Sequence, residues 1–107
     1  MKKEKIELQI LVLALDYEYA AIHSPKDSPG YDKAKMANDI CLSSYSELKN
    51  GTSIDELKQK VERVRNMFIE DPTEEGTKAY PLHLGVMEST KKIINLLDEN
   101  ESMEVGI

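Results

Sequence analysis

The sequence predicts an all-α protein: an antiparallel up-and-down bundle of four helices that ends in a short disordered tail. Apolar residues recur at spacings of three and four along four segments, which is the pattern of a helix with one buried face. Prolines, glycines and an asparagine stand between these segments and mark the connections. A chain of 107 residues has room for one domain. We therefore expect a single helical bundle over residues 1–98 and an acidic flexible tail over residues 99–107.

The stretch from Ile6 to Ile22 is predicted to be the first helix and is the most apolar part of the chain. Its apolar residues form two neighbouring stripes, one of Leu8, Leu11, Leu15 and Ile22, the other of Ile6, Ile10, Leu13, Tyr17 and Ala21. Two stripes require two sets of neighbours. One of them can pack against a second copy of the chain, which would make the protein a homodimer or higher oligomer.

This helix does not have the composition of a membrane segment. Asp16 and Glu18 interrupt the apolar run well before the ~20 residues that a membrane span requires. The basic start at Lys2 and Lys3 is broken by Glu4, and no small-residue cleavage site of a signal peptide follows. We therefore expect a cytoplasmic protein without a membrane segment.

The second and third helices have clear boundaries in the sequence. A loop with two prolines and a glycine separates the first helix from the second, which is predicted over Tyr31 to Leu48. Gly51 follows it, as glycine commonly does just past the end of a helix. Ser53 and Glu56 then form a capping box, in which each side chain satisfies free backbone N–H groups at a helix start. The third helix continues to Phe68.

A long connection at residues 71–81 leads to the last helix, which we expect to begin near Leu82 and to end at Leu97 or Asp98. In an up-and-down bundle, the first and third connections lie at the same end. Loops on a rigid scaffold commonly carry binding residues. The predicted partner-binding surface at this end consists of Tyr31, Asp71, Glu74, Glu75, Lys78, Tyr80 and His83.

Six residues of this surface, 76–81 (GTKAYP), resemble the tyrosine-proline contact region of the acidic helical nuclease-immunity proteins. The second tyrosine and the neighbouring acid of that region are missing, and Lys78 has the opposite charge. The chain is therefore not assigned to that family.

Composition argues against several functions. The formal net charge of −6 is unsuited to binding nucleic acid, since affinity for phosphates comes from clustered Lys and Arg. An acidic surface is suited to a basic protein partner. The single cysteine, Cys41, excludes an internal disulfide, and its place in the helical pattern predicts that it is buried.

We find no catalytic or metal-binding motif. His23 and His83 could be combined with Asp27, Asp71 or Glu88 in a metal site, but their spacing matches no known ligand pattern. The chain contains neither the Glu-x-x-His pair of dimetal bundles nor a P-loop. We expect no metal, no cofactor and no enzymatic activity.

Two functions from different classes remain. The first is a small acidic helical protein that docks on a larger protein and inhibits or modulates it, as immunity proteins, antitoxins and phage-encoded inhibitors do. The alternative is a homo-oligomer that binds a small molecule between its subunits, because its first helix is apolar on two faces.

Overall fold

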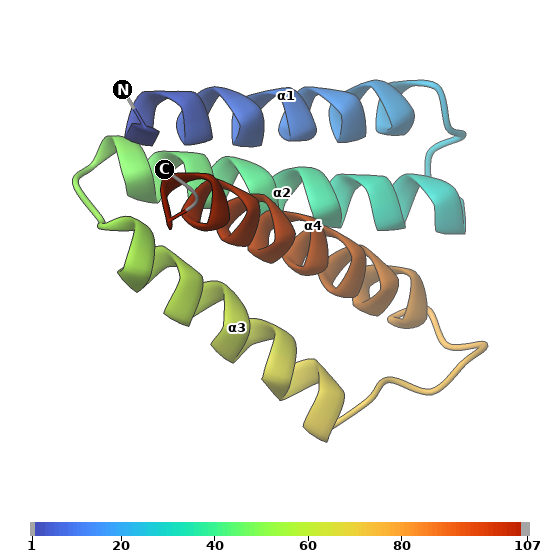
Figure 1. The fold of residues 1–107 in the computed structure, drawn as a ribbon. Coiled ribbons are helices and arrows are strands. Elements are labelled where there is room, and N and C mark those ends of the chain that lie inside the picture. Colours follow the sequence, from blue (N-terminus) through green and yellow to red (C-terminus); the bar gives the residue numbers. More distant parts are fainter. Residues whose placement is uncertain (1, 106–107) are drawn as a thin grey trace.

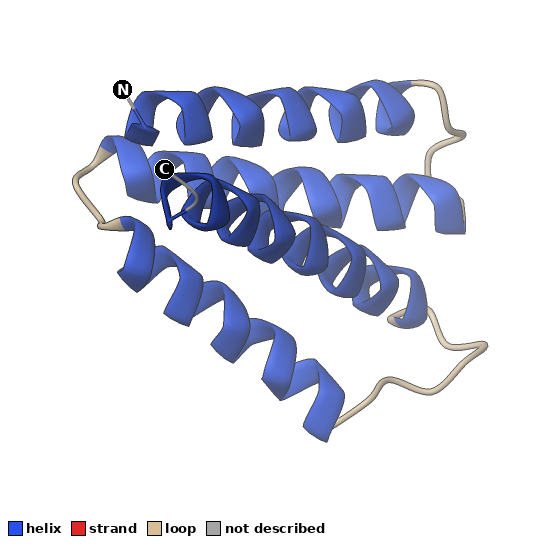
Figure 2. Cartoon of the chain, in the orientation of Figure 1, coloured by secondary structure: helices blue, strands red, loops and turns tan. Residues whose placement is uncertain are grey.

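The computed structural model describes residues 2–105, with side chains through residue 100, and this part of the chain folds into four helices without strands (Figure 2). The helices are α1 (Lys2–Ile22), α2 (Pro29–Lys49), α3 (Ile54–Glu70) and α4 (Tyr80–Val105). Successive helices run in opposite directions, as Figure 1 shows. The predicted all-α, up-and-down bundle is confirmed. Within the described part of the chain, none of the helices combines the length and the hydrophobicity that a membrane crossing needs.

The helices pack in the order α1, α2, α4, α3. α1 lies along α2, α2 packs against α4, and α4 against α3, whereas α1 has only a small contact with α4. α3 diverges from α2 after the short turn that joins them (Figure 1). One consequence is that α1 is an outer helix, covered by neighbours on one face.

Local sequence explains where the helices begin. The Ser28 hydroxyl accepts a hydrogen bond from the backbone N–H of Tyr31, and Pro29 occupies the first turn of α2, where its missing N–H costs nothing. The Ser53 hydroxyl accepts from the N–H of Glu56, as the predicted cap requires. Gly51 has a φ of 101°, a conformation that glycine adopts without strain.

The core is built from one stripe of α1 and the inner faces of α2, α3 and α4. Its fully buried members are Ile6, Ile10, Ala14, Ala37, Cys41, Leu48, Leu57, Ile93 and Leu97. Small residues allow α1 and α2 to approach closely, and the Asn38 amide donates a 2.7 Å hydrogen bond to the Ala14 carbonyl oxygen across this contact. The second stripe predicted for the first helix is therefore its buried face.

Gly85 lies at a close approach of α2 and α4. A Cβ atom at this position would lie 2.5 Å from the carbonyl oxygen of Lys33 and 3.3 Å from the backbone nitrogen of Ala37. Glycine inside a helix costs about 1 kcal/mol relative to alanine. Here it lets the backbones of the two helices touch.

α4 ends later than the sequence suggested. It continues to Val105, whereas its apolar pattern stops at Leu97. Asn100 extends the packing beyond that pattern, because its amide donates to the Gln9 side chain at 3.1 Å and to the Leu96 carbonyl at 2.8 Å. The last two positions of the predicted tail, 106 and 107, lie outside the described residues.

Candidate interaction surfaces

The loops at residues 23–28 and 71–79 lie at the same end of the bundle, as predicted (Figure 1). They do not form one surface, because α3 diverges and carries the second loop away from the first. His23 packs against Tyr19, with ring centroids 4.2 Å apart, whereas His83 packs against Phe68 at 5.5 Å. The two histidines therefore belong to separate contacts.

The residues of the predicted partner-binding surface divide into two groups. Asp71, Glu74, Glu75 and Lys78 are exposed, whereas Tyr31, Tyr80 and His83 are half-buried. Tyr80 stacks on His83 with an interplanar angle of 11° and centroids 6.0 Å apart.

Because His83 also packs on Phe68, these three rings join the start of α4 to the end of α3. The exposed acids are free to meet a partner, while the aromatic rings of Tyr80 and His83 stabilise the fold. The Nδ1 atom of His83 is buried without a hydrogen-bond partner among the described residues.

Glu88 is the centre of a polar cluster that joins α1, α2 and α4. Its carboxylate accepts a 2.9 Å hydrogen bond from the Tyr17 hydroxyl and lies 2.8 Å from Lys33 Nζ and 3.2 Å from Lys92 Nζ. The Lys33 hydrogen bond is the main reason why the pKa of Glu88 is lowered to about 2, against a smaller opposing effect of burial. Burial, reinforced by Glu88, raises the pKa of Tyr17.

These charges favour a structural role for Glu88 over metal binding, because two ammonium groups already neutralise the carboxylate. Across the described residues, no group of three or more His, Cys, Asp or Glu side chains is arranged to hold a metal ion. Cys41 is buried, as predicted, and burial raises its pKa to about 12.

The outer face of α1 carries a continuous stripe of exposed apolar side chains. The exposed fractions are 62% for Leu8, 56% for Val12, 53% for Leu15, 67% for Tyr19 and 71% for Ile22. We call these five residues the α1 stripe. Their spacing alternates between four and three residues along the helix, which is the spacing of a coiled-coil seam.

Sequence reasoning found part of this surface. It grouped Leu8, Leu15 and Ile22 with Leu11, but it included neither Val12 nor Tyr19. The alternation of four and three was present in the sequence as the signal for all five residues.

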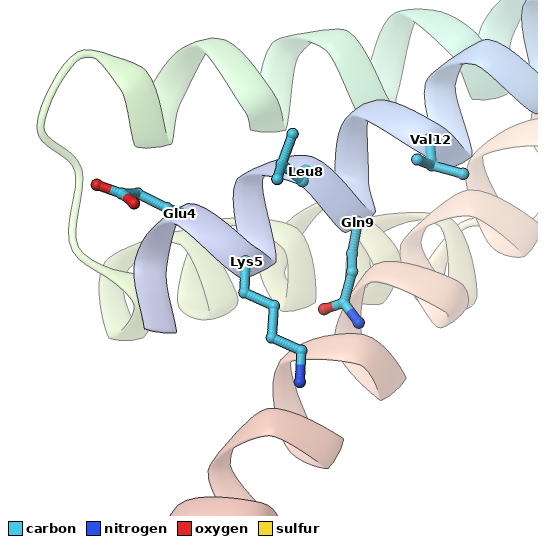
Figure 3. A pocket seen from close by; sticks show the side chains of 5 residues that line it. All are labelled: Glu4, Lys5, Leu8, Gln9 and Val12. Atoms are coloured by element: carbon cyan, nitrogen blue, oxygen red, sulfur yellow. The ribbon is translucent and has the colours of Figure 1, made fainter. Parts of the chain in front are cut away.

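A shallow surface hollow, open to solvent and lined by α1 alone, lies at the N-terminal end of the α1 stripe (Figure 3). Its lining residues are Glu4, Lys5, Leu8, Gln9 and Val12. Charges flank the stripe unevenly: Glu4 and Lys5 are both exposed near its start and offset each other, whereas Asp16 and Glu18 are exposed beside its second half. Within the described part of the chain, Lys5, Asp16 and Glu18 make no ion pair.

A smaller hollow of about 200 Å³ lies where α3 diverges from α2. Ser43, Leu57 and Val61 contribute to its wall, and an ion pair of 2.7 Å between Lys60 and Glu47 stands at its edge. This hollow lies within one chain, whereas the sequence led us to consider a ligand site between subunits.

No family model, no curated protein and no solved structure matches the chain.

Proposed function

We propose that the chain is a small helical protein whose function is to bind another protein through the α1 stripe. The observation that carries this proposal is the stripe itself: five large apolar side chains in one row, each more than half exposed. Their exposed fractions correspond to roughly 600 Å² of residue surface, most of it apolar, which is the upper end of what a monomeric protein leaves uncovered. Contiguous patches of this size are typical of protein contact sites.

The ionisable groups support binding over catalysis. General acid–base catalysis requires a group that exchanges protons near the working pH. The pKa of Glu88 is lowered to about 2 and that of Cys41 is raised to about 12, so each stays in one protonation state at neutral pH.

The acidic loop is a second candidate surface. Asp71, Glu74 and Glu75 are exposed there, and none of them forms an ion pair with another described residue. Such a surface suits a larger basic protein, which the chain would inhibit or modulate in the manner of an immunity protein, antitoxin or phage inhibitor. The two surfaces are compatible, because the loop lies beyond the end of the bundle, whereas the α1 stripe runs along its side.

Capture from cells that express the tagged chain, together with an untagged copy, tests which surface binds. We expect Leu15→Glu to abolish capture of the bound protein, and Ile69→Glu to leave it unchanged, because Ile69 is 54% exposed on α3, away from the stripe. A double variant, Glu74→Lys with Glu75→Lys, probes the acidic loop. If only the loop variant loses the captured protein, the acidic loop is the binding surface and the proposal for the α1 stripe is refuted.

A further inference from the structure

We infer that the α1 stripe binds a second copy of the same chain, with the two α1 helices antiparallel and Tyr19 of each copy inserted in the hollow beside Leu8 of the other. This inference rests on the proposed function and identifies its partner. Four properties of the surface support it: its spacing, its hollow, its charges and its area.

The spacing of the α1 stripe fits a self-complementary pairing. In an antiparallel pair, seam residues of one helix lie opposite seam residues of the other in successive layers. One register places Leu8 of one copy opposite Tyr19 of the other, and Val12 opposite Leu15. The two-fold axis between the copies generates each of these contacts a second time. Ile22 lies opposite Lys5, whose aliphatic stem can cover it. A shift by one heptad in either direction leaves part of the stripe without a partner, so this register buries the most apolar surface.

The hollow lies where this register needs one. A seam side chain inserts in a space bounded by four residues of the facing helix. Lys5, Leu8, Gln9 and Val12 are such a set, and they line the shallow hollow (Figure 3). The residue placed opposite this hollow is Tyr19, the largest side chain of the stripe.

The charges favour the antiparallel arrangement by a small margin, because the acidic Glu4 stands beside Lys5. The antiparallel arrangement places the exposed Lys5 of one copy within about one helical turn of the exposed Glu18 of the other. A parallel pair would instead set Lys5 against Lys5. Opposed helix macrodipoles add to the same preference.

The area reaches the lower limit of a stable dimer when the whole α1 stripe is covered. Two copies of a surface of roughly 600 Å² reach about 1,200 Å² in total, the lower limit of stable, specific interfaces. Each chain carries a net charge of −6, and the repulsion between copies opposes association. We therefore expect dissociation to be measurable in the micromolar range.

Sedimentation equilibrium of the purified chain tests the pairing. We expect the mass to rise with concentration from the 12.1 kDa of one chain to about 24 kDa. Leu15→Glu, which would place a carboxylate in the central layers, should weaken association by roughly 100-fold or more. Ile69→Glu is the matched control and should dimerise like the wild type. A wild type that stays monomeric at all concentrations, or a folded Leu15→Glu chain that still dimerises, would overturn the inference.

The orientation is tested by engineered disulfides. In the proposed register, a mixture of Lys5→Cys chains and Ile22→Cys chains should give mixed disulfide dimers under mild oxidation, identified by intact mass. Cys41 is buried with a raised pKa and should not contribute. Lys5→Cys chains that link to one another would show a parallel pair and refute the antiparallel arrangement.

The two proposals can fail separately. A wild type that is monomeric alone but loses a different captured protein on Leu15→Glu substitution would refute the second copy and keep the α1 stripe as the binding surface. A monomeric wild type whose stripe variants capture the same proteins as the wild type would refute both.

Discussion

Replacing Gly85 by alanine should destabilise the fold, although alanine is the better helix former. The added Cβ would lie 2.5 Å from the Lys33 carbonyl oxygen and 3.1 Å from Cβ of Met36. The first neighbour is a backbone atom near the start of α2, so α4 must move away by roughly half an ångström or more, because close-packed interiors leave no free space. Overpacking of this kind costs about 1–3 kcal/mol, while the higher helix propensity of alanine returns about 1 kcal/mol.

Urea unfolding followed by circular dichroism measures this balance. A clash with backbone relaxes less easily than one with a flexible side chain, so the overpacking cost lies in the upper part of its range, about 2–3 kcal/mol. After the gain in helix propensity, we expect the free energy of unfolding of Gly85→Ala to fall by about 1–2 kcal/mol. Asn95→Ala on the exposed face of α4 is the control, because it changes helix propensity without a packing cost, and it should be neutral or slightly stabilising. A Gly85→Ala chain as stable as the wild type would refute the close approach of α2 and α4.

Three further predictions concern buried and half-buried polar groups. The folded-state pKa of Glu88, about 2, lies below its ordinary value of 4.5, so its contribution to stability is present above pH 4.5 and is lost as the pH falls towards 2. Glu88→Gln should therefore lower the free energy of unfolding more at pH 7 than at pH 2.5, and an equal effect at both pH values would argue against the ion pair with Lys33. Asn38→Ala should lower the free energy of unfolding in urea by about 1–3 kcal/mol, because it leaves the buried Ala14 carbonyl without its side-chain donor. A cost below about 0.5 kcal/mol, which is within the range of ordinary surface substitutions, would show that this hydrogen bond is unimportant. Cys41 should react with a thiol reagent only after unfolding in urea, and rapid reaction of the native chain would show that the thiol is accessible.

The sequence was sufficient for the fold class but not for the choice of the buried face on α1. Both candidate stripes are apolar, so periodicity alone cannot tell which one packs on α2. Ala14 and Ala21 decide the choice, because small side chains let α2 approach on that side. Tyr17 follows into the interior, where its hydroxyl donates a hydrogen bond to Glu88, while Tyr19 is left on the outer face.

The predicted loop surface also depends on the angle between α3 and α2. The spacing of apolar residues along the chain does not determine that angle. Contacts far apart in the sequence hold α3 against α4 instead of α2. The Arg65 guanidinium donates a 2.6 Å hydrogen bond to the Met87 carbonyl, and Phe68 packs on His83. Gly85 was a usable signal for the close approach of α4 to α2, since a glycine inside a helical pattern often reflects close packing.

Pairing through α1 would change the arrangement of the acidic loops. Because the loop at residues 71–79 lies at the end of the bundle where α1 finishes, an antiparallel dimer would carry one such loop at each end. The dimer would then offer two separate acidic surfaces to basic partners, so that a second contact strengthens the first.

The central claim is that the outer face of α1 is covered by protein. A photo-crosslinking amino acid at Leu15 tests it most directly, with the same amino acid at Ile69 as the control, because both positions are about half exposed. We predict that irradiation of cells links the chain to a protein, a second copy or another, from Leu15 but not from Ile69. The absence of any product from Leu15, or equal products from both positions, would contradict the claim.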